Sequence, residues 1–116
     1  MTLSETTLFE ETLANARVGD VDSLRIIGDC YATGTRVEKD YKEAAVYYEE
    51  AASQGHAGAQ KCLGNMYANG VGVKQSYEKA FRLYQASADQ GNKRALFNLS
   101  LMYQIGHHID KDYKKA

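Results

Sequence analysis

The chain repeats itself with a period of 36 residues, and this spacing constrains its fold more than any single motif. Self-similarity at a period of about 20 to 50 residues is typical of a solenoid, in which stacked units share one elongated core. Such arrays usually bind other molecules rather than catalyse reactions. The clearest recurring positions are Gly28 and Gly64; Tyr31, Tyr67 and Tyr103; Gly34, Gly70 and Gly106; and Tyr41, Tyr77 and Tyr113.

Within each unit the apolar residues follow a helical period twice. Ala59 and Leu63 are followed four residues later by Tyr67, and a second stripe begins at Tyr77. Each unit is therefore predicted to be a pair of amphipathic helices, which makes the chain all-α. The predicted helices span residues 4–18, 20–33, 40–54, 56–69, 76–90 and 92–105.

The predicted helix boundaries repeat as regularly as the stripes. Preferred N-cap residues stand directly before each second helix, at Ser4, Asp40, Ser76 and Asp112. Asp40 together with Glu43 also fits a capping box. Recurring glycines follow the helices, where a left-handed residue closes the last turn without a Cβ clash.

Two glycines, Gly28 and Gly64, fall in the middle of predicted helices. Glycine there costs about 1 kcal/mol relative to alanine, so we expect a partner helix to approach closely at both positions. The recurring tyrosines are expected to pack in the core or between repeats rather than to form a stacking platform for a ligand.

Composition narrows the function classes. The chain has 116 residues, of which 44% are hydrophobic and 25% are charged, and this is typical of one globular domain. Its net charge is −1, so no overall positive electrostatic potential attracts nucleic acid or an anionic membrane. The first twenty residues lack the parts of a secretory signal. Cys30 and Cys62 fall in different columns of the repeat, so we expect free thiols and a cytoplasmic protein.

The second unit carries a family resemblance. It reads A-G-A-Q-K-C-L-G-N-M-Y-A-N-G-V-G-V-K-Q-S-Y-E-K-A-F-R-L-Y-Q-A-S-A-D-Q-G from Ala57 to Gly91 and resembles the SEL-one-like repeat (SLR), a relative of the tetratricopeptide repeat. The resemblance implies a right-handed α-α superhelix of antiparallel helix pairs that serves as an adaptor or scaffold for protein partners. It predicts a single SLR domain over 1–116, with a helix at 4–18 and repeats near 20–55, 56–91 and 92–116.

The chain also departs from the family pattern. Some secreted SLR proteins carry a disulfide in each repeat, and one such group is associated with β-lactam-like cell-wall compounds; this chain lacks the cysteine pairs. The third unit stops at Ala116, early in its second helix, so its apolar face is expected to be uncovered. Two alternatives follow: the chain is a fragment of a longer array, or another chain completes the end, possible self-association included.

Signals for catalysis are weak. His107 and His108 are adjacent in a predicted turn, and a solvated turn explains them better than a zinc site does. Glu49 and Glu50 are neighbours on a helix and indicate an exposed face rather than an acid and base pair. No hydrolase, metalloprotease or phosphate-loop motif is present in the sequence. We therefore expect a protein that is not an enzyme and that needs no metal or cofactor.

The predicted binding surface is the concave groove, which the first helix of each pair lines by analogy with tetratricopeptide arrays. Asn65 and Asn69 stand one turn apart, where they either hold the backbone of an extended peptide or are merely tolerated near a helix end. The groove residues are Arg25 and Asp29 in the first unit; Lys61, Asn65 and Asn69 in the second; and Arg94, Phe97, Leu101 and Ile105 in the third.

An apolar row departs from the repeat in the third unit. Phe97, Leu101 and Ile105 stand four residues apart, at columns that are charged or polar in the earlier units. We predict that the row provides apolar contacts to a partner, while the basic groove residues bind its acidic groups. The alternative is that a following helix buries the row.

Three function classes remain. The first is an interaction module that binds a protein or peptide in the groove, and the second is a dedicated inhibitor, such as an immunity protein that neutralises a toxin. The third is a hydrolase or a small-molecule binder of the cell-wall-compound type.

Overall fold

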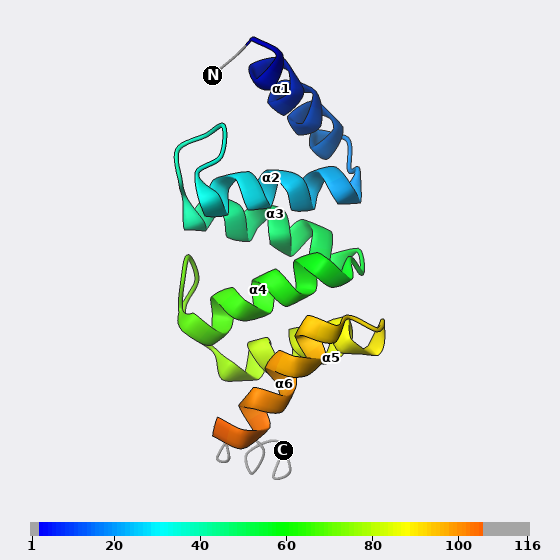
Figure 1. Cartoon of the computed structure of the whole chain (residues 1–116), viewed down its shortest axis with the longest axis vertical. Coiled ribbons are helices and arrows are strands. Elements are labelled where there is room, and N and C mark those ends of the chain that lie inside the picture. Colours follow the sequence, from blue (N-terminus) through cyan, green and yellow to red (C-terminus); the bar gives the residue numbers. More distant parts are fainter. Residues whose placement is uncertain (1–2, 106–116) are drawn as a thin grey trace.

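The computed structural model describes residues 3–105, and the side chains of residues 8–104, as an elongated stack of helices (Figure 1). Each helix packs chiefly against the helix before it and the helix after it. The described residues contain no strand, and the fold is an all-α helical repeat, as the sequence predicts. The helices are α1 (Leu3–Arg17), α2 (Val21–Thr33), α3 (Tyr41–Ser53), α4 (Ala57–Asn69), α5 (Tyr77–Asp89) and α6 (Lys93–Ile105).

The helix boundaries lie within one residue of the predicted ones. The difference arises at the caps, because Asp40 and Ser76 have extended backbones and therefore precede the helices that they cap. The Asp40 carboxylate accepts from the N–H groups of Lys42 and Glu43, whereas the Asp40 N–H donates to the Tyr31 carbonyl at 2.9 Å. That last bond takes the place of the reciprocal half of the expected capping box.

The two ends of the N-cap column differ from this pattern. Ser4 lies inside α1, which begins at Leu3, so the prediction that Ser4 caps this helix was wrong. Asp112 lies outside the described residues.

A second column of caps was not predicted. Asp20, His56 and Asn92 stand before the first helix of each pair, and each side chain accepts a backbone N–H three residues later. Hydrogen bonds from the Ser23 hydroxyl and N–H hold the pKa of Asp20 below its ordinary value. These caps fix where α2, α4 and α6 begin, and therefore which of their side chains face one another.

The mid-helix glycines are places of close approach, as predicted. A Cβ at Gly28 would lie 2.7 Å from the Tyr48 ring, and one at Gly64 would lie 2.8 Å from the Tyr84 ring. Tyr48 lies in α3 and Tyr84 lies in α5, so each ring comes from the second helix of the pair that contains the glycine. Both tyrosines are only 3% exposed. The pair α2–α3 and the pair α4–α5 are thus joined by the same glycine and tyrosine contact.

The expected burial of the recurring tyrosines holds only in part. Tyr31 and Tyr67 are half-buried, and the Tyr31 ring stacks on Tyr47 with centroids 5.8 Å apart. Tyr103 is exposed, and Tyr113 lies outside the described residues. Tyr41 and Tyr77 are also exposed, so core packing was the wrong prediction for both. They are the first residues of α3 and α5, and the Tyr41 ring instead lies under the Lys39 ammonium, 5.3 Å from its centroid.

Candidate functional site

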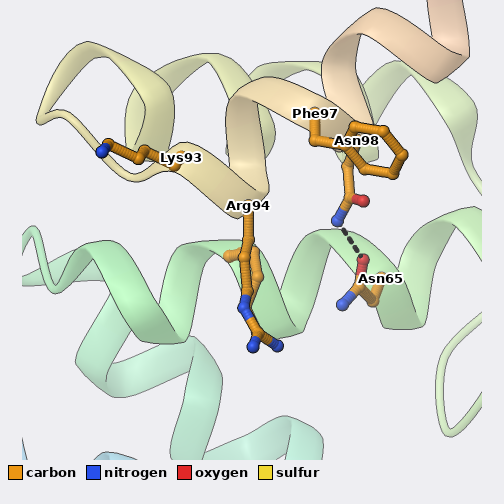
Figure 2. A pocket seen from close by; sticks show the side chains of 6 residues that line it. Asn65, Lys93, Arg94, Phe97 and Asn98 are labelled. Atoms are coloured by element: carbon orange, nitrogen blue, oxygen red, sulfur yellow. Dashed lines mark hydrogen bonds between the residues drawn. The ribbon is translucent and has the colours of Figure 1, made fainter.

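Four of the nine predicted groove residues line one pocket of about 480 Å³ between α4 and α6 (Figure 2). We call it the α4–α6 pocket. Helix α4 supplies two of its side chains, one turn apart, and α6 supplies the rest from its first turns. The lining residues are Lys61 and Asn65 from α4, and Lys93, Arg94, Phe97 and Asn98 from α6.

Two hydrogen bonds hold the side-chain amide of Asn65 in one orientation at the pocket. Its Oδ1 accepts one hydrogen bond from the Tyr84 hydroxyl at 2.5 Å and a second from Asn98 Nδ2 at 3.0 Å. The Tyr84 hydroxyl comes from α5 and Asn98 comes from α6, so one amide oxygen ties three helices together. Because both bonds use the oxygen, the orientation of the amide is set, and its nitrogen is left to face the pocket.

The pocket is positively charged. Lys61, Lys93 and Arg94 line it, no acidic residue does, and none of the three forms an ion pair within residues 8–104. In Figure 2 the Arg94 side chain extends from α6 toward α4, whereas Lys93 points along the turn before α6. A pocket with several cations and no anion is suited to an acidic group.

An aromatic side chain also lines this positively charged pocket. Phe97 is 63% exposed, although its column holds Arg25 and Lys61 in the earlier units. Its ring lies beside Asn98 in Figure 2. The pocket thus places an exposed aromatic side chain beside an arginine, and aromatic and arginine side chains are both enriched in protein interfaces.

The equivalent part of α2 has a different electrostatic character. The Arg25 guanidinium forms an ion pair with Asp29, and the Tyr48 hydroxyl donates to the same carboxylate. Nearby, Asp22 Oδ1 lies 3.1 Å from His56 Nε2. The Arg25 charge is therefore compensated within the protein, and neither Arg25 nor Asp29 lines the α4–α6 pocket.

The other predicted groove residues also lie outside the pocket. Asn69 Nδ2 donates to the Asn65 carbonyl at 3.0 Å, one turn back on the same helix. Leu101 is half-buried on α6. Ile105 is the last residue of α6, and its side chain lies outside the described residues.

Two lining residues, Lys93 and Asn98, were missed by the sequence analysis. Each departs from the repeat in the opposite sense to Phe97, because it is a polar residue at a column that holds small or apolar residues in the earlier units: Val21 and Ala57 for Lys93, and Ile26 and Cys62 for Asn98. A search for every polar departure on the third unit would have found both.

The histidines, the cysteines and the possible metal ligands are the other groups that the sequence analysis considered. Within the described residues, no three histidine, cysteine or acidic side chains gather as metal ligands would. His107 and His108 lie outside that part of the chain. Cys30 and Cys62 are free, as predicted, and burial raises the pKa of both thiols. The helices of the described part are too short or too polar to cross a membrane.

The fold is that of an α-helical repeat protein, and the α4–α6 pocket lies between neighbouring repeats. A family model named Sel1 repeat matches residues 21–56, 58–92 and 93–116. The chain therefore belongs to the Sel1 repeat family, as the sequence resemblance implied. In general this fold is a protein–protein interaction module, and proteins that carry it are typically scaffolds without enzymatic activity.

Solved structures agree with this assignment. A Sel1 repeat protein from Oxalobacter formigenes is similar with a TM-score of 0.82 and 30% identity, over 87% of this chain and 42% of its own. A protective antigen with an SLR fold from uropathogenic Escherichia coli gives 0.83 and 33%, over 87% and 22% of the two chains.

A third similar structure is more distant in sequence. Cysteine rich protein B from Helicobacter pylori gives a TM-score of 0.75 and 26% identity, over 80% of this chain and 70% of its own. The chain spans less than half the length of the first two proteins. No curated protein matches it in sequence.

Proposed function

We propose that this chain is a cytoplasmic, non-enzymatic interaction module that binds a segment of a partner protein along α2, α4 and α6, with the α4–α6 pocket as the main contact. The observation that carries the proposal is Phe97, a large aromatic side chain that is 63% exposed beside a pocket whose cations form no ion pair with the described residues. Aromatic and arginine side chains contribute most of the binding energy in many interfaces.

The repeat explains why this position is informative. A residue that a solenoid needs for packing recurs with the period, as Gly28 and Gly64 do with their tyrosines. Phe97 and Arg94 do not recur: their columns hold Arg25 and Lys61, and Asp22 and Gly58. The recurring packing contacts therefore give no reason for these two residues, which supports a role for them in binding a partner. The free thiols support a cytoplasmic location, where cysteines stay reduced.

Site-specific photo-crosslinking tests the proposal. A benzophenone amino acid is placed at Phe97 in one sample and at Val46 in another, and each protein is irradiated in lysate of cells that encode the chain. Val46 is a matched control because it is 51% exposed and lines a separate pocket on α3. We expect a discrete crosslinked partner at position 97 and none at position 46.

The opposite result would move the binding surface to α3, and crosslinks at neither position would contradict the proposed function. The identity of the captured protein also separates the two protein-binding alternatives. An enzyme whose activity the chain blocks would indicate a dedicated inhibitor, whereas a component of a larger assembly would indicate a scaffold.

A further inference from the structure

We propose that the α4–α6 pocket selects a carboxylate, supplied by an aspartate or glutamate beside an apolar residue in the partner segment, and that Asn65 determines this preference. This inference rests on the proposed function, because it specifies the partner that the same pocket takes. The evidence is a comparison of Asn65 with Asp29, which occupies the same column one repeat earlier.

Asp29 and Asn65 perform the same structural task. The Tyr48 hydroxyl donates to Asp29, and the Tyr84 hydroxyl donates to Asn65, each from the second helix of its own pair. Both tyrosine rings pack on the glycine one residue earlier in the first helix. The fold therefore requires an oxygen acceptor at this column, and either a carboxylate or an amide satisfies the requirement.

The two acceptors differ first in what they do to the surrounding charge. Asp29 pairs with Arg25 and so compensates a cation from within the protein. Asn65 carries no charge, and Lys61 and Arg94 on the same pocket remain unpaired among the described residues. A carboxylate of the partner can take the place of the missing one. Charge complementarity of this kind contributes more to the choice of partner than to the strength of binding.

The Asn65 amide also provides a donor for that anion. Its oxygen is occupied by Tyr84 and Asn98, and in Figure 2 its nitrogen lies on the side of the Arg94 guanidinium. An amide N–H and a guanidinium that face the same space can both donate to one carboxylate, which accepts at two oxygens. The same geometry offers nothing to a positively charged partner.

The surroundings favour a peptide over a nucleic acid. Phe97 presents an exposed ring at the pocket, which suits an apolar side chain next to the acidic one. A nucleic acid requires a track of phosphate contacts. Here the net charge is −1, and the corresponding cation on α2 is already paired with Asp29.

The test is selection of phage-displayed random dodecapeptides on the wild-type chain, followed by affinity measurement for the enriched peptides. We expect enrichment of aspartate or glutamate adjacent to an apolar residue. Replacing the acid of an enriched peptide with its amide should weaken binding about tenfold or more, which corresponds to about 1.4 kcal/mol. Added salt should weaken the acidic peptide more than its amide form.

Asn65→Asp is the decisive variant. It places a carboxylate in the pocket and keeps the acceptor for Tyr84, as Asp29 does for Tyr48, so the melting temperature should change little. Affinity for the acidic peptide should fall about tenfold or more. Asn15→Asp, an exposed change on α1, is the control with the same net charge and should bind as the wild type does.

Several outcomes would overturn the inference. Enriched peptides without an acid, unchanged affinity in a folded Asn65→Asp protein, or no enriched peptide at all would each do so. Binding of a single-stranded oligonucleotide in preference to every acidic peptide would also reject it. The proposed function is judged separately, since a partner that crosslinks at position 97 and lacks an acidic contact segment would support that function and reject only the carboxylate preference.

Discussion

The Tyr84 ring occupies the space that a side chain at Gly64 would fill. A Cβ at this position would lie 2.8 Å from Tyr84 Cε1, closer than packed carbon atoms approach. The Tyr84 hydroxyl continues past the glycine to Asn65, the next residue along α4. One side chain thus sets both the distance between α4 and α5 and the orientation of the amide in the pocket.

Gly64→Val is expected to lower the free energy of unfolding by about 1–3 kcal/mol, because the added side chain overlaps the Tyr84 ring. Thermal or urea unfolding measures the change. Ser100→Val on the exposed side of α6 controls for the β-branched residue in a helix and should shift stability by about 0.5 kcal/mol or less. Equal effects from the two variants would show that the contact with Tyr84 is not the cause.

Stability should fall in alkaline solution as the buried tyrosines ionise. Burial raises the pKa of Tyr84 to about 12, and burial together with the bond to Asp29 raises the pKa of Tyr48. An unfolded tyrosine ionises near its ordinary pKa of about 10. The stabilisation is therefore complete below about pH 10 and is lost as the pH rises toward 12.

Melting temperatures recorded from neutral to alkaline pH measure this loss. Tyr84→Phe cannot ionise at this site, so its melting temperature should fall less steeply with pH than that of the wild type. The variant should also be less stable at neutral pH, by about 0.5–1.5 kcal/mol, because the hydrogen bond to Asn65 is gone. Identical slopes for both proteins would assign the alkaline transition to other groups.

Much of the fold was predictable because the repeat places the same local signals at the same offsets. The caps at Asp40 and Ser76 and the left-handed turns at Gly34 and Gly70 depend on short-range geometry, which a sequence shows directly. The mid-helix glycines also predicted a close approach. Which tyrosine makes that approach depends on how the helices cross, and a 36-residue period holds no information on crossing.

The candidate site was less predictable for a related reason. Helical spacing placed Lys61, Asn65, Arg94 and Phe97 correctly on one surface, since those positions follow from the period alone. The sequence could not show that Arg25 is paired with Asp29 while Lys61 has no ion-pair partner among residues 8–104, because pairing depends on rotamers and on Tyr48. That difference divides the predicted groove into a compensated part on α2 and a cationic part between α4 and α6.

The two thiols should react at different rates in the folded protein and equally after denaturation. Cys30 is buried and Cys62 is half-buried, and burial raises the pKa of both, which lowers the thiolate fraction at neutral pH. Alkylation followed by mass spectrometry should label Cys62 first. A mass lower by two protons under non-reducing conditions would instead reveal a disulfide.

Self-association through α6 stays a prediction of the repeat pattern. Leu96 is 56% exposed, whereas Leu24, its counterpart two repeats earlier, is 1% exposed. An exposed apolar position at the last described helix can dock on another copy of the chain. Light scattering over a range of concentrations should show that Leu96→Glu favours the monomer relative to the wild type. Val46→Glu, at a similarly exposed position on α3, is the control, and a monomeric wild type would reject the prediction.

Substitutions of Phe97 and of the pocket cations should have different effects on the binding of the crosslinked partner. Phe97→Ala is expected to weaken binding by about 2 kcal/mol, as loss of an interface anchor does. It should change the free energy of unfolding by about 0.5 kcal/mol or less, because the ring is 63% exposed. A large loss of stability with unchanged affinity would instead place Phe97 in the core.

Lys61→Ala should slow association and reduce its dependence on salt, because Lys61 lines the pocket and is unpaired within the described part of the chain. Arg25→Ala is the matched cation removal, and we expect almost no change in the association rate because Asp29 already compensates Arg25. Stopped-flow or surface-based kinetics at two ionic strengths distinguish the variants. Equal slowing by both would mean that the partner responds to the total charge of the groove, and the division between α2 and the α4–α6 pocket would be wrong.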